Sequence, residues 1–149
     1  MVDPVRMLHE ARSVLLVDWP STDVPQTLAG AGYEVIVKGG PEPGRYSVWE
    51  LQDGAVAVRP MGRPPAHADI VYAHRPLDEL AGIVTLAEQV GARMVWCQSG
   101  RASRQASDPR GCWVSEDESQ RARSMVESAG LAYVDDVYIA DAVRAGPGR

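Results

Sequence analysis

Four short segments of this sequence combine cations, glycines and polar side chains. They are Trp19-Pro20-Ser21-Thr22, Lys38-Gly39-Gly40, His74-Arg75-Pro76 and Gln98-Ser99-Gly100. Lysine and arginine supply positive charge, glycine lets a backbone approach a ligand closely, and glutamine both donates and accepts hydrogen bonds. Serine hydroxyls and free N–H groups at helix starts can bind phosphate, and the Trp19 indole can stack on a ring. Together these residues have the chemistry to bind an anionic, nucleotide-like small molecule.

Each segment also has a purely structural interpretation. A lysine at a strand end is often only a solvated charge, and a pair of glycines is common in loops. Arg75-Pro76 can begin a helix, and Trp19 can cover the core. Gln98 directly after a buried strand is the residue that best favours ligand binding. The prediction of a site therefore depends on whether the fold brings all four segments together.

The elements that would position these segments follow from short apolar runs and helix-start signals. Buried parallel strands read as apolar runs with polar boundaries, and the sequence has such runs at residues 13–18, 33–38, 69–73, 93–97 and 131–134. Capping and periodicity predict helices at residues 4–10, 23–31, 76–90, 116–129 and 139–144. Among these signals, Asp23 with Gln26 and Ser115 with Glu118 resemble capping boxes, and Met125 falls on the apolar stripe of its helix.

Strands therefore alternate with helices, except at one hairpin around Asp53-Gly54, where residues 47–52 and 55–59 flank the turn. This pattern predicts a single α/β domain over residues 1–149, with its core at residues 13–140 and a hairpin insertion at about 45–60. The domain would have three layers, with helices on both faces of a parallel sheet of about five strands. All strands would end at one edge, where ligands bind near the reversal of strand order. The four segments directly follow strands and should meet there.

Composition narrows the function classes. The chain has 149 residues and a net charge of −5, which argues against nucleic acid and against a polybasic membrane anchor. Its apolar runs are too short for a membrane helix, and residues 1–13 lack the features of a secretory signal. We therefore expect a cytoplasmic protein in which Cys97 and Cys112 remain thiols.

Few residues suggest catalysis. A Cys97–His74 pair across neighbouring strands could form a nucleophile, although a cysteine that ends a buried strand is usually part of the core. Two cysteines and three histidines without close pair spacing do not predict a zinc site. Asp135-Asp136 follows the last strand and is predicted to be a capping or solvated pair. No catalytic residue and no metal ligand is assigned.

The second half of the chain resembles a known family. Residues 69–76 read DIVYAHRP, residues 91–100 read GARMVWCQSG, and residues 122–135 complete the pattern. This order of a strand, Arg-Pro, a helix, Gly-Ala and a Trp-x-Gln-x-Gly strand end resembles the stand-alone coenzyme-A-binding-domain proteins, small relatives of the nucleotide domain of succinyl-CoA ligase. The resemblance implies a Rossmann-like fold, coenzyme A or an acyl-CoA as the ligand, and no chemistry. The residues that would contact the ligand are Lys38, Arg75, Gln98 and those of the loop that follows the first strand.

The first loop departs from the family pattern. The family has a glycine-containing turn there that cradles pyrophosphate, whereas this chain reads Asp18-Trp-Pro-Ser-Thr-Asp23. Two carboxylates therefore lie where phosphate would bind, and like charges repel in a cleft. The phosphates could bind elsewhere, the ligand could differ, or binding could be lost. Three hypotheses follow: a CoA-binding module, a degenerate domain that acts as an interaction or regulatory protein, and an enzyme that acts on a thioester through Cys97.

Two further segments look like additions to the minimal family domain. They are the hairpin at about residues 45–60 and the loop at residues 99–113. They could close over a ligand or form a surface for a protein partner, and the hairpin with an exposed Trp49 makes a homodimer possible.

Overall fold

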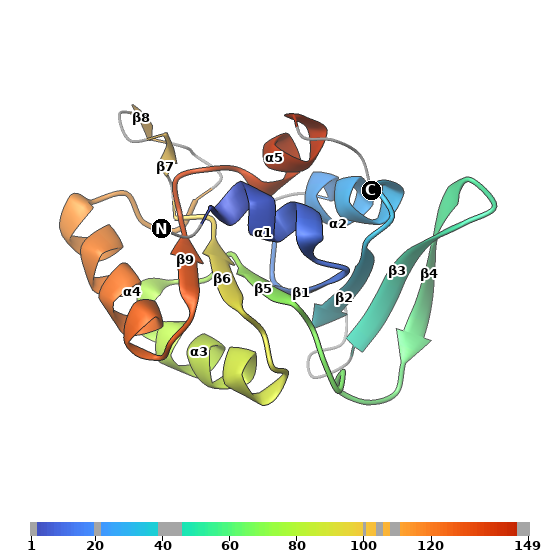
Figure 1. Ribbon diagram of the computed structural model, residues 1–149, viewed down its shortest axis with the longest axis horizontal. Helices are drawn as coiled ribbons and strands as arrows, with labels where there is room; N and C mark the ends of the chain where they lie inside the picture. Colours follow the sequence, from blue (N-terminus) through green and yellow to red (C-terminus); the bar gives the residue numbers. More distant parts are fainter. Residues whose placement is uncertain are drawn as a thin grey trace.

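The computed structural model describes residues 3–19, 22–38, 46–99, 101–103, 106–107 and 111–145. The helices are α1 (Pro4–Glu10), α2 (Asp23–Gly30), the 3-10 turn η1 (Leu77–Glu79), α3 (Leu80–Gln89), α4 (Glu116–Ser128) and α5 (Ile139–Ala145). The strands are β1 (Ser13–Val17), β2 (Glu34–Lys38), β3 (Tyr46–Gln52), β4 (Ala55–Met61), β5 (Ile70–Ala73), β6 (Met94–Cys97), β7 (Arg101–Ser103), β8 (Ala106–Ser107) and β9 (Ala132–Val134). Figure 1 shows their arrangement.

The main sheet has the order β4-β3-β2-β1-β5-β6-β9. Strands β2, β1, β5, β6 and β9 are parallel, which confirms the predicted parallel sheet of five strands. The predicted hairpin is present as β3 and β4, and it pairs antiparallel with β2, so the sheet has seven strands. Its turn has positive φ at Asp53 (52°) and Gly54 (83°), as a two-residue hairpin turn requires.

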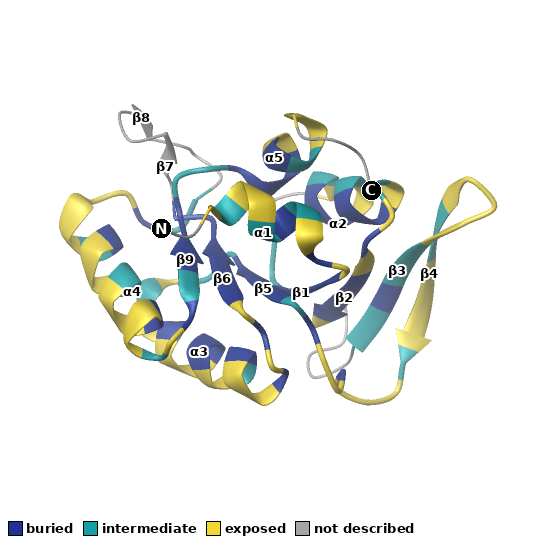
Figure 2. Ribbon diagram, in the orientation of Figure 1, coloured by how far each residue is buried: buried dark blue, intermediate teal, exposed yellow. Residues whose placement is uncertain are grey.

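Helices cover both faces of the sheet, as the sequence predicts. Helices α1, α2 and α5 pack on one face, and α3 and α4 on the other (Figure 1). Adjacent residues of β1, such as Leu15 and Leu16, are both fully buried but belong to opposite clusters, because strand side chains alternate between faces. Figure 2 shows the central strands as buried and the outer surface of α4 as exposed. The uninterrupted apolar runs in the sequence are explained by this double burial.

The predicted capping box at the start of α2 is wrong. The N-cap residue is Thr22, whose side chain makes no capping hydrogen bond, and Asp23 is the first residue of the helix. The Asp23 carboxylate instead accepts hydrogen bonds from Arg144 and Tyr138 of the α5 region, and from Thr27. The ion pair with Arg144 is the main reason that the pKa of Asp23 is lowered. Asp23 therefore pairs with Arg144, more than a hundred residues away, instead of forming the predicted capping box with Gln26.

Three smaller expectations also change. Trp49, which is expected to be exposed, is half-buried and packs against the cluster under α1, α2 and α5. Met125 is 39% exposed rather than part of the buried stripe of α4, which consists of Ser119, Ala122 and Val126. The segment at residues 99–113, predicted as a loop, contains the short antiparallel pair β7–β8.

The capping box predicted at Ser115 and Glu118 is confirmed by both of its hydrogen bonds. Within the described ranges, no helix has the length and apolar character needed to cross a bilayer.

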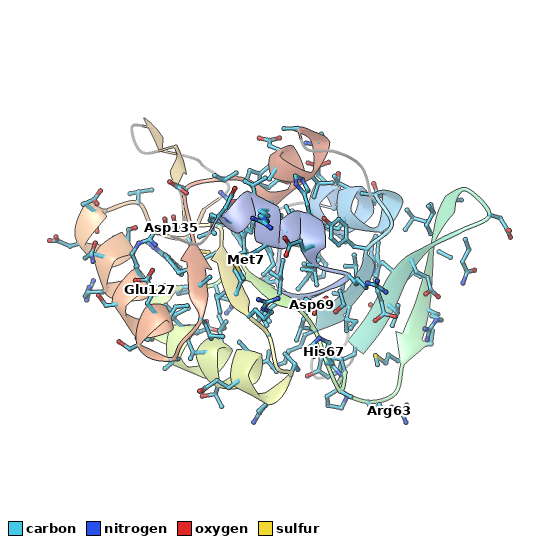
Figure 3. All side chains as sticks on the ribbon, viewed as in Figure 1. Met7, Arg63, His67, Asp69, Glu127 and Asp135 are labelled. Carbon is cyan, nitrogen blue, oxygen red and sulfur yellow. The ribbon has the colours of Figure 1, made fainter. Side chains whose placement is uncertain are left out.

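Asp69 joins the starts of β1 and β5 at the amino edge of the sheet. Its carboxylate accepts hydrogen bonds from the backbone N–H of Arg12 (2.8 Å) and of Ser13 (3.2 Å), and its other oxygen lies 2.8 Å from Nε2 of His67. Figure 3 labels Asp69 and His67 beside each other. Burial raises the pKa of Asp69, but the hydrogen bonds from Arg12, His67 and Ser13 outweigh it, so the pKa lies below its usual value.

We predict that Asp69→Asn lowers the free energy of unfolding by about 1–2 kcal/mol at neutral pH, because a neutral amide is a weaker acceptor for these donors. A group whose folded-state pKa is lowered stabilises the fold above its unfolded pKa, and this contribution is lost as the pH falls through the folded pKa. The difference from wild type should therefore shrink below about pH 4. Urea unfolding across this pH range measures it, with the exposed Asp78→Asn as the control. A difference that does not change with pH would contradict the assignment.

Candidate functional site

The strand register brings the predicted site segments to one edge. Val17 is paired with Lys38 on one side and with Ala73 on the other, and Ala73 is paired with Cys97. The residues that follow this row therefore leave the sheet at the same carboxyl edge. Strand β2 lies on one side of β1, and β5 and β6 lie on the other, so the strand order reverses between β1 and β5. This is the position where open α/β sheets bind their ligands.

Asp18 makes the turn after β1. Its φ is +64°, in the left-handed region that favours glycine. One carboxylate oxygen accepts a hydrogen bond from the backbone N–H of Trp19 (2.9 Å), and the other accepts one from Nη1 of Arg75 (3.0 Å). The backbone thus adopts a glycine-like turn without a glycine, and the Asp18 side chain occupies two donors at the strand-order reversal.

Arg75 is bound by two carboxylates. Besides Asp18, Glu79 accepts from its Nε (3.0 Å) and its Nη2 (2.6 Å) in a two-pronged pair. The hydrogen bonds from Arg75 to Glu79 and Asp18 raise the pKa of Arg75, and the bond to Arg75 is the main reason that the pKa of Glu79 is lowered. The guanidinium is therefore charged and fixed in orientation, but its donors on two sides already have acidic partners.

Several predicted site residues lie at the edge with different exposures. Lys38 is exposed at the end of β2, Thr22 is exposed at the start of α2, and Pro76 is exposed before η1. Trp19 is partly buried and packs against the cluster under α1, α2 and α5. Five further members of the predicted set lie outside the described residues: Pro20, Ser21, Gly39, Gly40 and Gly100.

His74 is partly buried directly after β5. Its backbone N–H donates to the carbonyl of Val17 (3.1 Å), which extends the β1–β5 pairing by one residue. Its ring atom Nε2 is buried and has no hydrogen-bond partner among the described residues. A buried polar atom without a partner is unfavourable, so this nitrogen is suited to a ligand or a water at the edge.

Gln98 and Ser99 are fully buried. The segment of Cys112 and Trp113 lies along them: the Cys112 N–H donates to the Gln98 carbonyl (3.1 Å), and the Trp113 N–H donates to the Ser99 carbonyl (2.6 Å). The Ser99 hydroxyl donates to the carbonyl of Asp135 (2.8 Å). The two residues thus lie at the predicted edge, but beneath a covering segment rather than at an open surface.

Of the two alternatives predicted for Asp135, a capping or a solvated residue, the solvated one is wrong. Asp135 is only 2% exposed, and one oxygen of its carboxylate accepts from the Ser119 hydroxyl (2.5 Å) and the Tyr133 hydroxyl (2.9 Å). Its carbonyl accepts from Ser99, so it joins α4, β9 and the segment after β6. The rule that selected the other candidates could have found it, because Asp135 also directly follows a buried parallel strand. Asp135 is labelled in Figure 3.

Cys97 is poorly suited to be a nucleophile. It is fully buried, and burial strongly raises the pKa of its thiol, with further contributions from Asp135 and Cys112. The thiolate is the reactive form of cysteine, so the environment suppresses it. Burial also raises the pKa of the half-buried Cys112. In the described parts of the chain, no group of three or more His, Cys, Asp or Glu side chains could hold a metal ion.

A cavity of about 860 Å³ lies elsewhere, against edge strand β9 and helix α4. Arg123, Tyr133 and Asp136 are among its lining residues, whereas Asp18, Lys38 and Arg75 are not. Arg123 crosses this region, with its guanidinium carbon 5.2 Å from the centre of the Tyr133 ring and a hydrogen bond to the Tyr133 carbonyl (3.4 Å). It therefore shields the outer edge of the sheet.

The buried hydrogen bonds of Asp135 predict that substitutions at this residue lower the free energy of unfolding strongly. Asp135→Ala leaves two hydroxyl donors without their shared acceptor, so we expect the free energy of unfolding to fall by about 3 kcal/mol. Tyr133→Phe removes one donor and should cost about 1 kcal/mol, and Asp135→Asn, which keeps an acceptor, should be milder than Asp135→Ala. Urea unfolding measures all three, and an Asp135→Ala protein as stable as wild type would refute the network's role.

The burial of Cys97 predicts selective thiol reactivity. In the native protein, Ellman's reagent should modify Cys112 slowly and leave Cys97 unmodified until the chain is unfolded, because only a thiolate that is accessible to the reagent reacts. The Cys112→Ser protein should then have no reactive native thiol, whereas Cys97→Ser should behave like wild type. Rapid native modification of Cys112→Ser would show that Cys97 is accessible.

The sequence and the fold of this chain are similar to those of known proteins. A family model described as "CoA binding domain" matches residues 16–140. No curated protein matches the sequence. Among solved structures, one titled "The structure of cell-free ID.343 from Thermus thermophilus" is similar, with a TM-score of 0.55 and 20% identity over 94% of this chain and 93% of that chain. At this identity the likeness concerns the fold alone.

Proposed function

Because this chain belongs to the CoA binding domain family, we propose that it binds coenzyme A or an acyl-CoA at the carboxyl edge of its parallel sheet and performs no reaction of its own. The observation that carries the proposal is the register that aligns Lys38, Val17, Ala73 and Cys97 in one row. The row brings four chain segments together at the reversal of strand order, which is where such sheets bind nucleotides.

Part of this edge fits the chemistry of coenzyme A. Lys38 is the chain's single lysine, and it is exposed at the edge, where it can pair with a phosphate. Thr22 is the N-cap residue of α2, and it offers a hydroxyl beside the first N–H groups of that helix. The buried Nε2 of His74 can exchange a hydrogen bond with a ligand. Gln98 and Ser99 are fully buried, and their carbonyls are bonded to the Cys112 and Trp113 N–H groups, so neither side chain is open to a ligand in this structure.

The edge does not fit phosphate at Asp18. There, Arg75 already has two carboxylate partners. This observation favours the alternative function, a degenerate nucleotide-binding domain that acts as an interaction or regulatory protein. The third hypothesis, an enzyme that acts on a thioester through Cys97, is disfavoured by the complete burial of that thiol.

Calorimetric titration of the full chain with coenzyme A, acetyl-CoA, ADP and NAD tests the proposal. We expect saturable binding of coenzyme A and acetyl-CoA, with acetyl-CoA recovered intact by chromatography. Lys38→Ala should weaken binding about tenfold, the value of one charge-assisted contact. The matched control is Arg93→Ala, which removes an exposed cation that precedes β6 at the opposite edge and should leave the affinity unchanged. No binding at millimolar ligand would reject the proposal and favour the alternative.

A further inference from the structure

Two hydrogen-bond donors among the described residues at the reversal of strand order are bound to one side chain of the chain itself. The Trp19 N–H and the Arg75 guanidinium both donate to Asp18, at 2.9 and 3.0 Å. We propose that Asp18 is a specificity-determining residue, an internal anion that competes with the phosphate of a ligand for these donors. The inference rests on the proposed function, and it adds which residue limits the affinity for phosphate-bearing ligands.

The backbone supports this role. Asp18 has a φ of +64°, a conformation that glycine adopts freely and that other residues adopt with strain. Aspartate tolerates it better than most because its short carboxylate can bond to nearby backbone, and here it accepts the very next N–H. The turn therefore has the left-handed conformation that glycine favours, and the Asp18 side chain accepts the backbone N–H that follows it.

The local charge also supports it. Arg75 is paired with Asp18 and Glu79, so these three groups carry one excess negative charge. Asp23, the first residue of α2, is paired with Arg144 rather than with Arg75. An incoming phosphate would meet a cation that already has two carboxylate partners, and it would compete with Asp18 for the Trp19 N–H and for Nη1 of Arg75. Ligand groups without phosphate would meet no such competition.

Substitutions at position 18 separate the effect of the occupied donors from the effect of the negative charge. Asp18→Gly suits the positive φ, frees both donors and removes the charge, whereas Asp18→Asn removes the charge but can still accept the Trp19 N–H. We expect Asp18→Gly to bind coenzyme A about tenfold or more tighter than wild type, which corresponds to one like charge near the phosphate at partial exposure. Asp18→Asn should gain less. Pantetheine, which has no phosphate, should bind all three proteins equally.

Glu79→Gln is the matched control. It also removes one carboxylate from Arg75, but Glu79 does not contact the Trp19 N–H. It should therefore gain less affinity than Asp18→Gly. Thermal unfolding of each protein confirms that it is folded. In Asp18→Gly we expect the relief of the positive φ to offset the loss of the contacts with the Trp19 N–H and Arg75, so the protein stays folded.

Titration with inorganic pyrophosphate distinguishes this inference from the proposed function. If wild type binds coenzyme A and Asp18→Gly binds neither coenzyme A nor pyrophosphate more tightly, the inference is wrong and the proposed function stands. If no variant binds coenzyme A but Asp18→Gly gains pyrophosphate binding, the proposed function is wrong and the inference stands. If pantetheine gains as much as coenzyme A, the effect is not a competition with phosphate, and the inference fails.

Discussion

The parallel pairing of β1 with β5 is the interaction on which the rest of the structure depends. At the amino end, Asp69 accepts the backbone N–H groups that begin β1. At the carboxyl end, Asp18 and Arg75 join the residues that follow the two strands. The pair is therefore held at both ends by side chains as well as by its ladder. Since the strand order reverses between these two strands, the same pairing fixes where the candidate site lies.

The strands were predictable because their environment is simple. A strand covered on both faces needs apolar side chains along its length, and β5, β6 and β1 after Ser13 have them. The hairpin was predictable because Asp53-Gly54 suits a turn with two positive φ angles. The start of α2 was not, because Asp23 pairs with Arg144 and Tyr138, which only the folded chain brings near. Local patterns cannot include such distant partners.

At the candidate site, too, some features follow from local sequence patterns and others depend on distant contacts. Topology alone places Lys38, Arg75 and Gln98 at one edge, and the register agrees. The states of these side chains follow from contacts that the sequence pattern does not reveal. Arg75 is bound by Asp18 across neighbouring strands, and Gln98 lies under the Cys112-Trp113 segment. Two adjacent acids suggest capping or solvent exposure, whereas Ser119 and Tyr133 supply buried donors for Asp135, the first of them.

The acids at this edge connect binding with stability. A turn built for phosphate has donors that lack partners when no ligand is bound, and such donors lower the stability of the free fold. In this chain, Asp18 supplies a partner for the Trp19 N–H and for Arg75, and Asp135 does the same for the hydroxyls of Ser119 and Tyr133. These donors therefore have partners in the free protein, whereas the buried Nε2 of His74 has none among the described residues. Because an anion that takes the donors bound by Asp18 must replace an existing contact, the contacts of Asp18 weaken the binding of such an anion.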